Sequence, residues 1–585
     1  MRSVVEEKRV EALVVHIEWE RIFMKIDLKV QINDNRVDLS KLDFYAVNGY
    51  YKAKAKFKVT GIDGDIVHLK VNVTNNGENR CIPTGTYRIF ICQGEEKLAD
   101  CEADRSIVND FDSLSRNFLY DAKNSVYAVT FYVQEEEECM PFRFHILVGD
   151  KGDMDFPHYG NFFLELHLIK NFRYALGGKR KFLDRVYHIY HFFLGRKRKN
   201  TILFMSEQNE AIASNLKAVS DRMKERGLDK EYRLLFSSRS AAAMGQSKIS
   251  WFAVIRKLAE SGMVIIDDHA PVLDWLQLAD DTKVVQLWHA GAGFKSSGYS
   301  RWGHLGCPSP SSCHRQYAFG IAGSKKIAPF FSEVWGINDE QVLPTGMPRM
   351  DQFLDPAYRE KKTKELYEKY PVAKGKKVIL FAPTYRGKNK KFAFYPYEKI
   401  DFKKLYELCG DEYIVFFKMH PWVSQKVPIE KKYQDKFFDV GKYPNINDLF
   451  YITELLITDY SSNIFEYSMM HKPMLFFAFD KLQYSFSRGF HRAYEESAPG
   501  KVCDTFEEVL EAIEKQDFEY EKVEQYVEHH FDYTDSHASD RVIDWIIRGE
   551  LPEDIRKDLK RVEDENLYME TLDFYPELIG EAVEE

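Results

Sequence analysis

Apolar and polar residues alternate along several short stretches in the first part of the chain. In 65–73 (DIVHLKVNV) every second residue is apolar, and 125–133 and 142–149 repeat the pattern. Such alternation is typical of strands that bury one face. Because no helical period separates these strands, we predict a β-sandwich domain over 1–172. The region carries no catalytic constellation, which leaves packing, acceptor binding and assembly as its alternative roles.

A different pattern begins near residue 200. Short apolar runs such as TILFMS and GMVIID are separated by stretches with helical spacing, and after LPTGMPRMDQF the alternation resumes with KKVILFAP and ELLITDYSS. Two successive units of this kind predict two doubly wound, Rossmann-like α/β domains with a cleft between them. Their predicted ranges are 200–355 and 356–548. The acidic residues 549–585 are predicted to form a peripheral tail.

The segment 173–199 connects the two patterns. Two basic clusters, 179–181 and 196–199, bracket a helix-length stretch rich in Phe, Tyr and Leu. Cations that flank aromatic and aliphatic residues suit the surface of an anionic membrane, where each contributes about 1 kcal/mol. The alternative is a buried connecting helix whose ends are solvated. The sequence leaves both interpretations open.

The composition is that of a globular protein with more than one domain. The chain has 585 residues, 44% of them hydrophobic, and a net charge of -9, which argues against nucleic acid as a main partner. No run of about 18 apolar residues occurs, and acidic residues interrupt the N-terminal stretch. We therefore expect neither a membrane-spanning helix nor a signal peptide. Eight scattered cysteines suit a reducing cytoplasm.

One group of metal-binding residue types lies in a short stretch of the chain and consists of His304, Cys307, Cys313 and His314. Its spacing lacks the close ligand pairs of zinc sites, which favours ordinary thiols in a loop. The sequence therefore predicts no metal centre.

Reactive side chains follow several of the predicted strands. His289 stands at the end of one strand, where LWHAGAGFK passes into a loop of small residues. Thr384 and Arg386 follow another strand in FAPTYRG, and His420 follows a third in KMHP. Open α/β sheets bind ligands at the carboxyl ends of their strands, and small loop residues let a ligand approach the backbone. These four residues are therefore candidates for one site.

A fourth strand end carries groups suited to bind an anion. In ITDYSSNIFEYSMM, Asp459, Ser461 and Ser462 precede a predicted helix that contains Glu466. A serine-capped helix directs free N–H groups at the cleft, where they can bind a phosphate or diphosphate. Arg488, in RGF, adds a cation able to hold phosphate through two bonds. Together these groups predict transfer chemistry on a diphosphate-activated donor.

The order and spacing of these motifs make the C-terminal 385 residues similar to the CDP-glycerol glycerophosphotransferase family, the teichoic acid primases and polymerases of Gram-positive bacteria. The matching pieces are WHAGAGFK, GMPRMD, FAPTYRG, KMHP, TDYSSNIFEYSMMHKP, DKLQYSFSRGF and DSHASDRV. The resemblance implies a GT-B fold of the two Rossmann-like domains, without membrane spans, attached peripherally to the cytoplasmic face of the membrane.

The family's activity is also implied. It transfers polyol phosphate from CDP-ribitol or CDP-glycerol to a hydroxyl of an undecaprenyl-diphosphate-linked acceptor and releases CMP. No metal or other cofactor is expected, and homo-oligomerisation stays open. Glycerol-phosphate members usually carry WHGTPLK at the first histidine, whereas WHAGAGFK resembles the ribitol-phosphate branch, which tends to have an extra N-terminal β-domain. Ribitol is therefore slightly favoured as the polyol.

The resemblance assigns roles to the candidate residues. His289 is expected to act as the general base, since a hydroxyl nucleophile needs a base with a pKa near 7, and Lys295 is expected on the acceptor side. His420, the second catalytic residue, is expected to hold the diphosphate and to stabilise the charge on leaving CMP. The residues expected to share this task are Arg488, Ser461 and Ser462.

The remaining candidates are expected on the donor side. Thr384 and Pro421 would shape the nucleotide pocket, and Arg386 and Glu466 would lie beside the phosphates. Asp459 has two interpretations: an anion at a helix N-terminus, which we favour because of the helix dipole, or a holder for a neighbouring basic group.

Two other functions remain open. A glycosyltransferase with the same GT-B fold would use a nucleotide sugar to build a cell-surface glycopolymer, and the fold alone does not exclude it. A non-catalytic polymer-binding subunit is the third hypothesis. The presence of both His289 and His420 argues against it.

Overall fold

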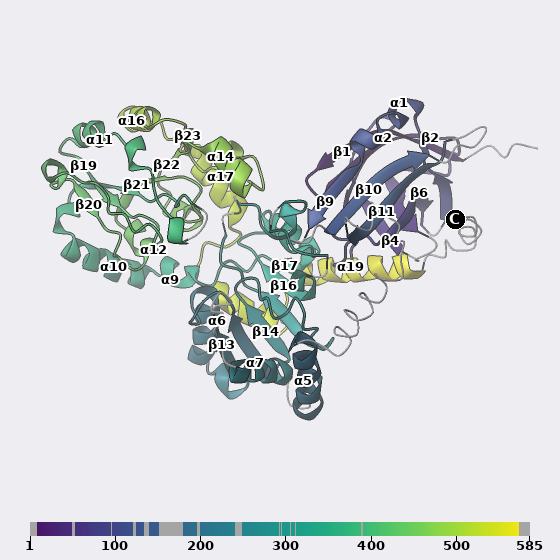
Figure 1. Cartoon of the computed structure of the whole chain (residues 1–585), viewed down its shortest axis with the longest axis horizontal. Coiled ribbons are helices and arrows are strands. Elements are labelled where there is room, and N and C mark those ends of the chain that lie inside the picture. The colour runs from purple at the N-terminus through teal and green to yellow at the C-terminus, as the bar shows by residue number, and fades with distance from the viewer. Residues whose placement is uncertain are drawn as a thin grey trace, which may run out of the picture.

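The computed structural model has three packed parts (Figure 1). A β-rich domain comes first, and two α/β units with parallel sheets follow. Among the residues that the structure describes, no helix is long and apolar enough to cross a membrane. The described residues are 9–48, 53–94, 96–120, 125–133, 140–150, 179–195, 199–239, 248–291, 293, 295–304, 306–310, 312–387 and 390–571.

The N-terminal domain is rich in β-strands, as the sequence predicted. Its strands follow one continuous hydrogen-bonded path because β4 (Ala53–Asp63) pairs with β3 (Asp43–Asn48) through its first half and with β5 (Ile66–Asn72) through its second half. A strand that changes partners midway lets the sheet fold over its own core. The alternation predicted for 65–73 is confirmed, since the apolar side of β5 is buried. The other strands are β1 (Val10–Glu20), β2 (Phe23–Ile32), β6 (Gly85–Gln93), β7 (Glu96–Asp100), β8 (Glu102–Ala103), β9 (Arg116–Tyr120), β10 (Ser125–Val133) and β11 (Phe142–Asp150).

The first α/β unit contains a six-stranded parallel sheet in the order β13-β12-β14-β15-β16-β17. Its strands are short and mostly buried, as expected when helices cover both faces of a parallel sheet. The strands are β12 (Thr201–Ser206), β13 (Arg233–Ser238), β14 (Met263–Ile266), β15 (Lys283–Gln286), β16 (Tyr317–Ile321) and β17 (Val342–Leu343). The helices of this unit include α6 (Ser214–Glu225), α7 (Lys248–Glu260), α8 (Ala328–Trp335) and α9 (Met350–Leu354).

The second α/β unit has a six-stranded parallel sheet in the order β20-β19-β18-β21-β22-β23. This is the strand order of dinucleotide-binding folds, in which the ligand binds where the order reverses, here between β18 and β21. The strands are β18 (Lys377–Phe381), β19 (Tyr413–Phe417), β20 (Phe437–Asp439), β21 (Thr453–Thr458), β22 (Met474–Phe477) and β23 (Lys501–Cys503). The helices include α10 (Pro356–Lys369), α11 (Phe402–Cys409), α12 (Ile446–Phe450), α13 (Ile464–Ser468), α14 (Lys481–Arg488), α15 (Tyr494–Ser497), α16 (Phe506–Lys515) and α17 (Glu521–His530).

After α17 the chain returns to the first α/β unit. Asp540 of α18 (Ala538–Arg541) forms ion pairs with Arg222 of α6 and with Arg226, which directly follows that helix. These charged contacts hold the last residues of the predicted range 356–548 against the first α/β unit, and the predicted domain bounds stay a prediction.

The acidic C-terminal segment begins with a docked helix, α19 (Glu553–Thr571), which Figure 1 shows running beneath the β-rich domain. Asp558 pairs with Lys325 of the first α/β unit, and Asn566 donates a hydrogen bond to the Gly77 carbonyl of the β-rich domain at 3.1 Å. The predicted tail 549–585 thus bridges two parts of the molecule as far as residue 571. Residues 572–585 lie outside the described residues.

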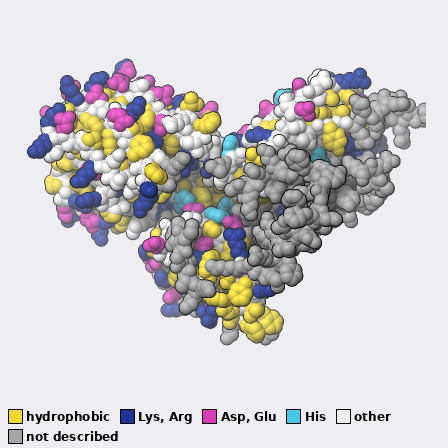
Figure 2. Space-filling model, in the orientation of Figure 1, with side chains coloured by type: hydrophobic (Ala, Val, Ile, Leu, Met, Phe, Trp, Pro, Cys, Tyr) yellow, Lys and Arg dark blue, Asp and Glu magenta, His cyan; other side chains and the backbone are white. Residues whose placement is uncertain are grey.

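The connecting segment contains α5 (Lys179–Leu194), which packs on the first α/β unit. Leu183 and Tyr187 are buried there, whereas the side chains of Phe192 and Phe193 are 75% and 72% exposed. The space-filling view shows apolar side chains at this end of the molecule (Figure 2). The buried face of the helix fits the interpretation as a connecting helix, and the exposed phenylalanines fit the interpretation as a membrane contact. Within 173–199, residues 173–178 and 196–198 lie outside the described residues.

Candidate active site

A cavity of about 300 Å³ opens where the strand order of the second parallel sheet reverses. The loops after β18 and β21 supply much of its wall, and a loop of the first α/β unit contributes one lysine. Figure 2 shows histidine side chains gathered in the hollow between the two α/β units. The predicted residues that line the cavity are Lys295, Thr384, His420, Pro421, Ser461 and Ser462.

Positive charge is concentrated around this cavity. The side chain of Lys295 is exposed at its surface but lies between the walls of the cleft. The resulting desolvation, together with the charges of Arg488 and Arg386, lowers the pKa of its ammonium group, although Asp459 opposes the shift. Desolvation and the charge of Lys295 also lower the pKa of His420. Cations that raise each other's free energy in this way are stabilised by a bound anion. The cavity is therefore electrostatically suited to a diphosphate.

His420 follows β19, and its ring is oriented by the backbone. The N–H of Trp422 donates to His420 Nδ1 at 3.2 Å, so the imidazole proton is on Nε2. The ring also packs on Tyr385, with centroids 4.7 Å apart. With its pKa lowered, His420 is neutral near pH 7 and can donate one hydrogen bond from Nε2 to a phosphate oxygen.

Arg488 ends α14 beside the cavity. Its Nη2 donates to the hydroxyl of Tyr385 at 3.2 Å, and Tyr385 is one of the lining residues. The sequence prediction that Arg488 lies near the phosphate site is compatible with this position.

His289 lies at the end of β15, outside the cavity lining. Its Nδ1 is 3.2 Å from Oδ2 of Asp268, and half of its side chain is exposed. The following loop touches the second α/β unit, because a Cβ on Gly291 would lie 2.6 Å from the ring of Phe465 in α13. A carboxylate at Nδ1 leaves Nε2 as the acceptor that a general base requires.

Arg386 and Asp459 differ from their predicted positions. The Arg386 guanidinium binds Asp480 at 2.5 and 2.9 Å and Asp459 at 2.9 Å, and all three side chains are largely buried. Asp459 also accepts from the N–H groups of Thr384 and Tyr460 at 2.8 and 2.6 Å. The guanidinium is thus occupied by carboxylates instead of facing a phosphate. The favoured interpretation of Asp459 as a helix N-terminal anion is wrong, and the alternative holds: it anchors a basic group.

The helix after Ser462 is shorter than predicted. The cap of α13 is Asn463, and the Ser461 hydroxyl accepts from the Asn463 N–H at 3.3 Å. The predicted serine cap is therefore wrong by one or two positions, since the turn continues to Asn463 before the helix begins. Both serines still line the cavity.

Glu466 is also displaced from its predicted role. It is buried in α13 and forms an ion pair with Arg349 of the first α/β unit, in which Nε donates at 2.8 Å. Arg349 additionally binds the carbonyl oxygen of His289. Glu466 therefore joins the two α/β units behind the His289 loop, and its carboxylate is paired with Arg349.

Asp268 and Arg349 are candidate site residues, in contact with His289, that sequence reasoning missed. Arg349 lies in GMPRMD, a motif that contributed to the family resemblance without a chemical role, and Asp268 follows β14 in a pair of aspartates. A rule that searches every strand end for carboxylates would have found Asp268. The partner of Arg349 depends on tertiary contact, which no local pattern indicates.

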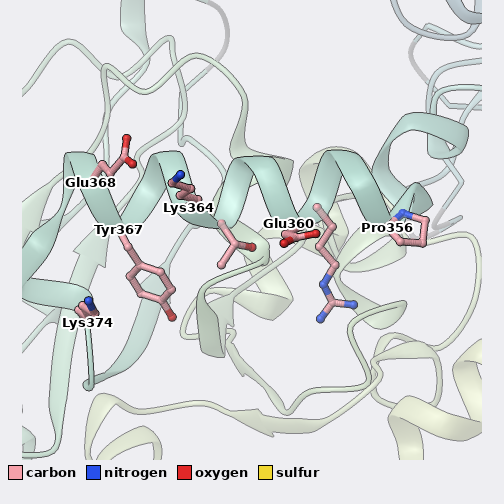
Figure 3. A pocket seen from close by; sticks show the side chains of 8 residues that line it. Pro356, Glu360, Lys364, Tyr367, Glu368 and Lys374 are labelled. Carbon is pink, nitrogen blue, oxygen red and sulfur yellow. The ribbon is translucent and has the colours of Figure 1, made fainter.

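A second cavity, of about 680 Å³, is lined by side chains of α10, including Glu360 and Lys364, and by Lys374 beyond the end of this helix (Figure 3). In the predicted His/Cys group, His314 Nδ1 lies 2.8 Å from the Tyr317 hydroxyl, and Cys307 Sγ lies 3.5 Å from the Leu119 carbonyl. The third residue of the group, Cys313, lies beside His269 and Asp274, and the ligand atoms of these three residues are within 4.8 Å of one another, as a bound metal ion requires. The interpretation of ordinary loop thiols without a metal therefore stays a prediction.

Three features define the class of protein: the strand order of the second parallel sheet, the positively charged cavity and the pair of His289 with Asp268. They are those of an α/β enzyme that acts on a nucleotide diphosphate. Residues 187–548 match the family of CDP-glycerol:poly(glycerophosphate) glycerophosphotransferases. The chain therefore belongs to this family of CDP-polyol phosphotransferases, which confirms the resemblance noted in the sequence.

Individual relatives agree with this assignment. The chain is 36% identical over 378 residues to the teichoic acid ribitol-phosphate polymerase TarL of Staphylococcus aureus, covering 64% of this chain and 67% of that protein. It is 32% identical over 529 residues to the teichoic acid poly(ribitol-phosphate) polymerase of Bacillus spizizenii, covering 88% and 82%. The structure of the wall teichoic acid polymerase TagF superimposes with a TM-score of 0.50 at 23% identity, covering 68% of this chain and 98% of that one, and supports the fold.

Proposed function

We propose that the chain transfers ribitol phosphate from CDP-ribitol to a hydroxyl of a lipid-linked acceptor in teichoic acid biosynthesis, releasing CMP. The observation that carries the proposal is the cavity in which Lys295, His420 and the serine turn meet beside Arg488. Similarity to ribitol-phosphate polymerases over most of the chain supports ribitol as the polyol. The two α/β units would form a GT-B fold, with the donor in the second unit and the acceptor on the first.

The donor diphosphate would occupy the positively charged part of the cavity. Nε2 of His420 would donate one hydrogen bond, and Lys295 and Arg488 are the cations beside it. Thr384 and Pro421 form part of the wall toward the nucleotide. The same groups stabilise the charge that develops on CMP as it leaves, where preorganised donors contribute most. Because these residues provide the charge, we propose no metal or other cofactor, and chelation by EDTA should leave CMP release unchanged.

His289 would activate the acceptor. Its Nε2 takes the proton of the attacking hydroxyl, whose oxygen bonds to the phosphorus attached to ribitol while the bond between that phosphorus and the bridging oxygen of CMP breaks. The phosphodiester and CMP are the products, and Asp268 stabilises the imidazolium until the proton leaves. The Gly291 contact with Phe465 brings this loop against the unit that would hold the donor.

The acceptor requires the enzyme to work at a membrane surface, which we propose to be the cytoplasmic face. Two exposed apolar surfaces fit this role. One is the outer side of α5, with Phe192 and Phe193. The other is on α14, where Leu482 and Phe486 are 85% and 97% exposed and lie one helical turn apart. The α14 surface ends at Arg488, so it would bring the donor site close to the lipid.

A parallel assay with CDP-ribitol, CDP-glycerol and a UDP-sugar tests the proposed function. Release of CMP should be fastest from CDP-ribitol in the presence of a teichoic acid acceptor primed with polyol phosphate. Preference for CDP-glycerol would correct the polyol. Turnover of the UDP-sugar without turnover of either CDP-polyol would favour the glycosyltransferase hypothesis and overturn the proposal.

A further inference from the structure

Arg21 of the β-rich domain reaches the first α/β unit from the tight turn between β1 and β2. Its backbone has a φ of 55°, which residues other than glycine rarely adopt. Its Nε and Nη2 donate to the two carboxylate oxygens of Glu333, in α8, at 2.8 and 3.0 Å. The side chain of Glu333 is only 5% exposed. A bidentate pair of this kind fixes the orientation of both groups.

Glu333 contacts the second α/β unit as well. Its Oε2 lies 2.8 Å from Nε2 of His491, whose side chain is fully buried. The His491 ring packs on Phe330, also in α8, with centroids 3.8 Å apart. Burial by itself would raise the pKa of Glu333, but its contacts with His491 and Arg21 outweigh burial and lower the pKa to about 2. One carboxylate therefore joins all three parts of the molecule.

His491 belongs to the loop that follows Arg488 at the donor cavity. This loop pairs with the loop after His289, since the Ser296 N–H donates to the Gly489 carbonyl at 3.2 Å and Lys295 forms a β-bridge with Phe490. Helix α8 thus contacts His491, close to Arg488, and Arg21 binds the carboxylate of Glu333 on α8.

We propose that the β-rich domain, through Arg21 and Glu333, positions the Arg488 loop for binding of the donor diphosphate. The inference rests on the proposed function, in which Arg488 binds the donor. Arg21 and Glu333 would be positioning residues: they act through His491 and touch neither donor nor acceptor. The domain would then tune donor affinity in addition to any role in binding the polymer.

A double-mutant cycle on the full-length chain tests the proposal. Binding of CDP-ribitol and CDP-glycerol is measured by calorimetry for Arg21→Ala, Arg488→Ala and the double variant. Changes in positioning residues that touch no ligand alter affinity by about twofold to thirtyfold. We expect Arg21→Ala to weaken donor binding within this range. It should add nothing once Arg488 is already alanine, because both changes would remove the same contact, that of Arg488 with the donor diphosphate.

Three further variants separate positioning from general stability. Arg36→Ala removes an exposed arginine of the same domain that pairs with Asp34, and it should bind donor as wild type does. Arg21→Lys keeps the charge without the planar fork and should restore affinity in part. Glu333→Gln tests the same link from α8 and should raise KM for the donor more than it lowers kcat.

The outcomes distinguish this inference from the proposed function. If Arg488→Ala binds donor normally, the donor site itself is misassigned. If Arg488→Ala weakens binding while folded Arg21→Ala and Glu333→Gln bind as wild type, only the positioning role fails. Additive losses in the double variant would also overturn it, because they would show that Arg21 acts independently of Arg488.

Discussion

Replacement of Asp268 by asparagine should impair turnover while leaving donor affinity intact. Asp268 Oδ2 lies 3.2 Å from Nδ1 of His289 and does not line the donor cavity. The carboxylate favours the tautomer with the proton on Nδ1 and stabilises the imidazolium that forms when Nε2 takes a proton. An asparagine can present its amide N–H to Nδ1 instead, which would place the proton on Nε2 and block the base.

The size of the effect follows from distance and exposure. Unit charges about 4 Å apart interact by roughly 1 kcal/mol in water and roughly 4 kcal/mol near a protein surface. The side chain of His289 is 51% exposed and that of Asp268 is 26% exposed, so a value between these limits applies. Since each 1.4 kcal/mol corresponds to a factor of ten, kcat should fall about 10- to 100-fold.

The assay is steady-state release of CMP at saturating acceptor, with donor affinity measured separately by calorimetry. Asp267→Asn is the matched control, because this neighbouring carboxyl is buried and lies 3.4 Å from Asn209 Nδ2. It should retain a kcat close to that of wild type. Wild-type turnover in Asp268→Asn would refute the assignment of His289 as a base oriented by this carboxylate. Equal loss in both variants would indicate damage to the strand end.

Three other predictions concern stability and membrane binding. Arg386→Leu should lower the free energy of unfolding in urea by about 3–5 kcal/mol, because it leaves two buried carboxylates without their cation; a loss below 1 kcal/mol would contradict this. Replacing Leu482 and Phe486 by serine should reduce co-sedimentation with anionic liposomes more than Phe193→Ser does, and the reverse order would assign the membrane contact to α5. Burial lowers the pKa of His530 to about 3, so the unfolded chain binds more protons than the folded chain between pH 6.5 and 3. The free energy of unfolding, at its full value above pH 6.5, should therefore fall by about 2 kcal/mol at pH 5. His530→Phe should flatten this pH dependence in thermal unfolding, and an unchanged slope would be inconsistent with a neutral buried His530.

The periodicity of the sequence was sufficient to predict the elements that carry the site. Strands β18 and β21 contain the apolar runs VILF and LLI, and the residues that follow them, including Thr384 and Ser461, face one cavity because parallel strands end at the same edge. The family resemblance also rested on local motifs and is confirmed.

The wrong assignments share a physical cause. Arg386 and Glu466 were expected at the phosphates because a charged group beside a strand end is a reasonable ligand for an anion. Each is neutralised by a partner that lies far away in the sequence: Asp480 for Arg386 and Arg349 for Glu466. A buried charge needs such a partner, but the sequence does not indicate which residue the fold will bring to it.

The most direct test of the central claim is mass spectrometry of the acceptor after incubation of the full-length chain with CDP-ribitol. The account predicts that a lipid-linked acceptor gains ribitol phosphate units, one for each CMP released, and that His289→Ala abolishes the gain while the protein stays folded and still binds CDP-ribitol. CMP release without any addition to the acceptor, or undiminished addition by His289→Ala, would contradict it.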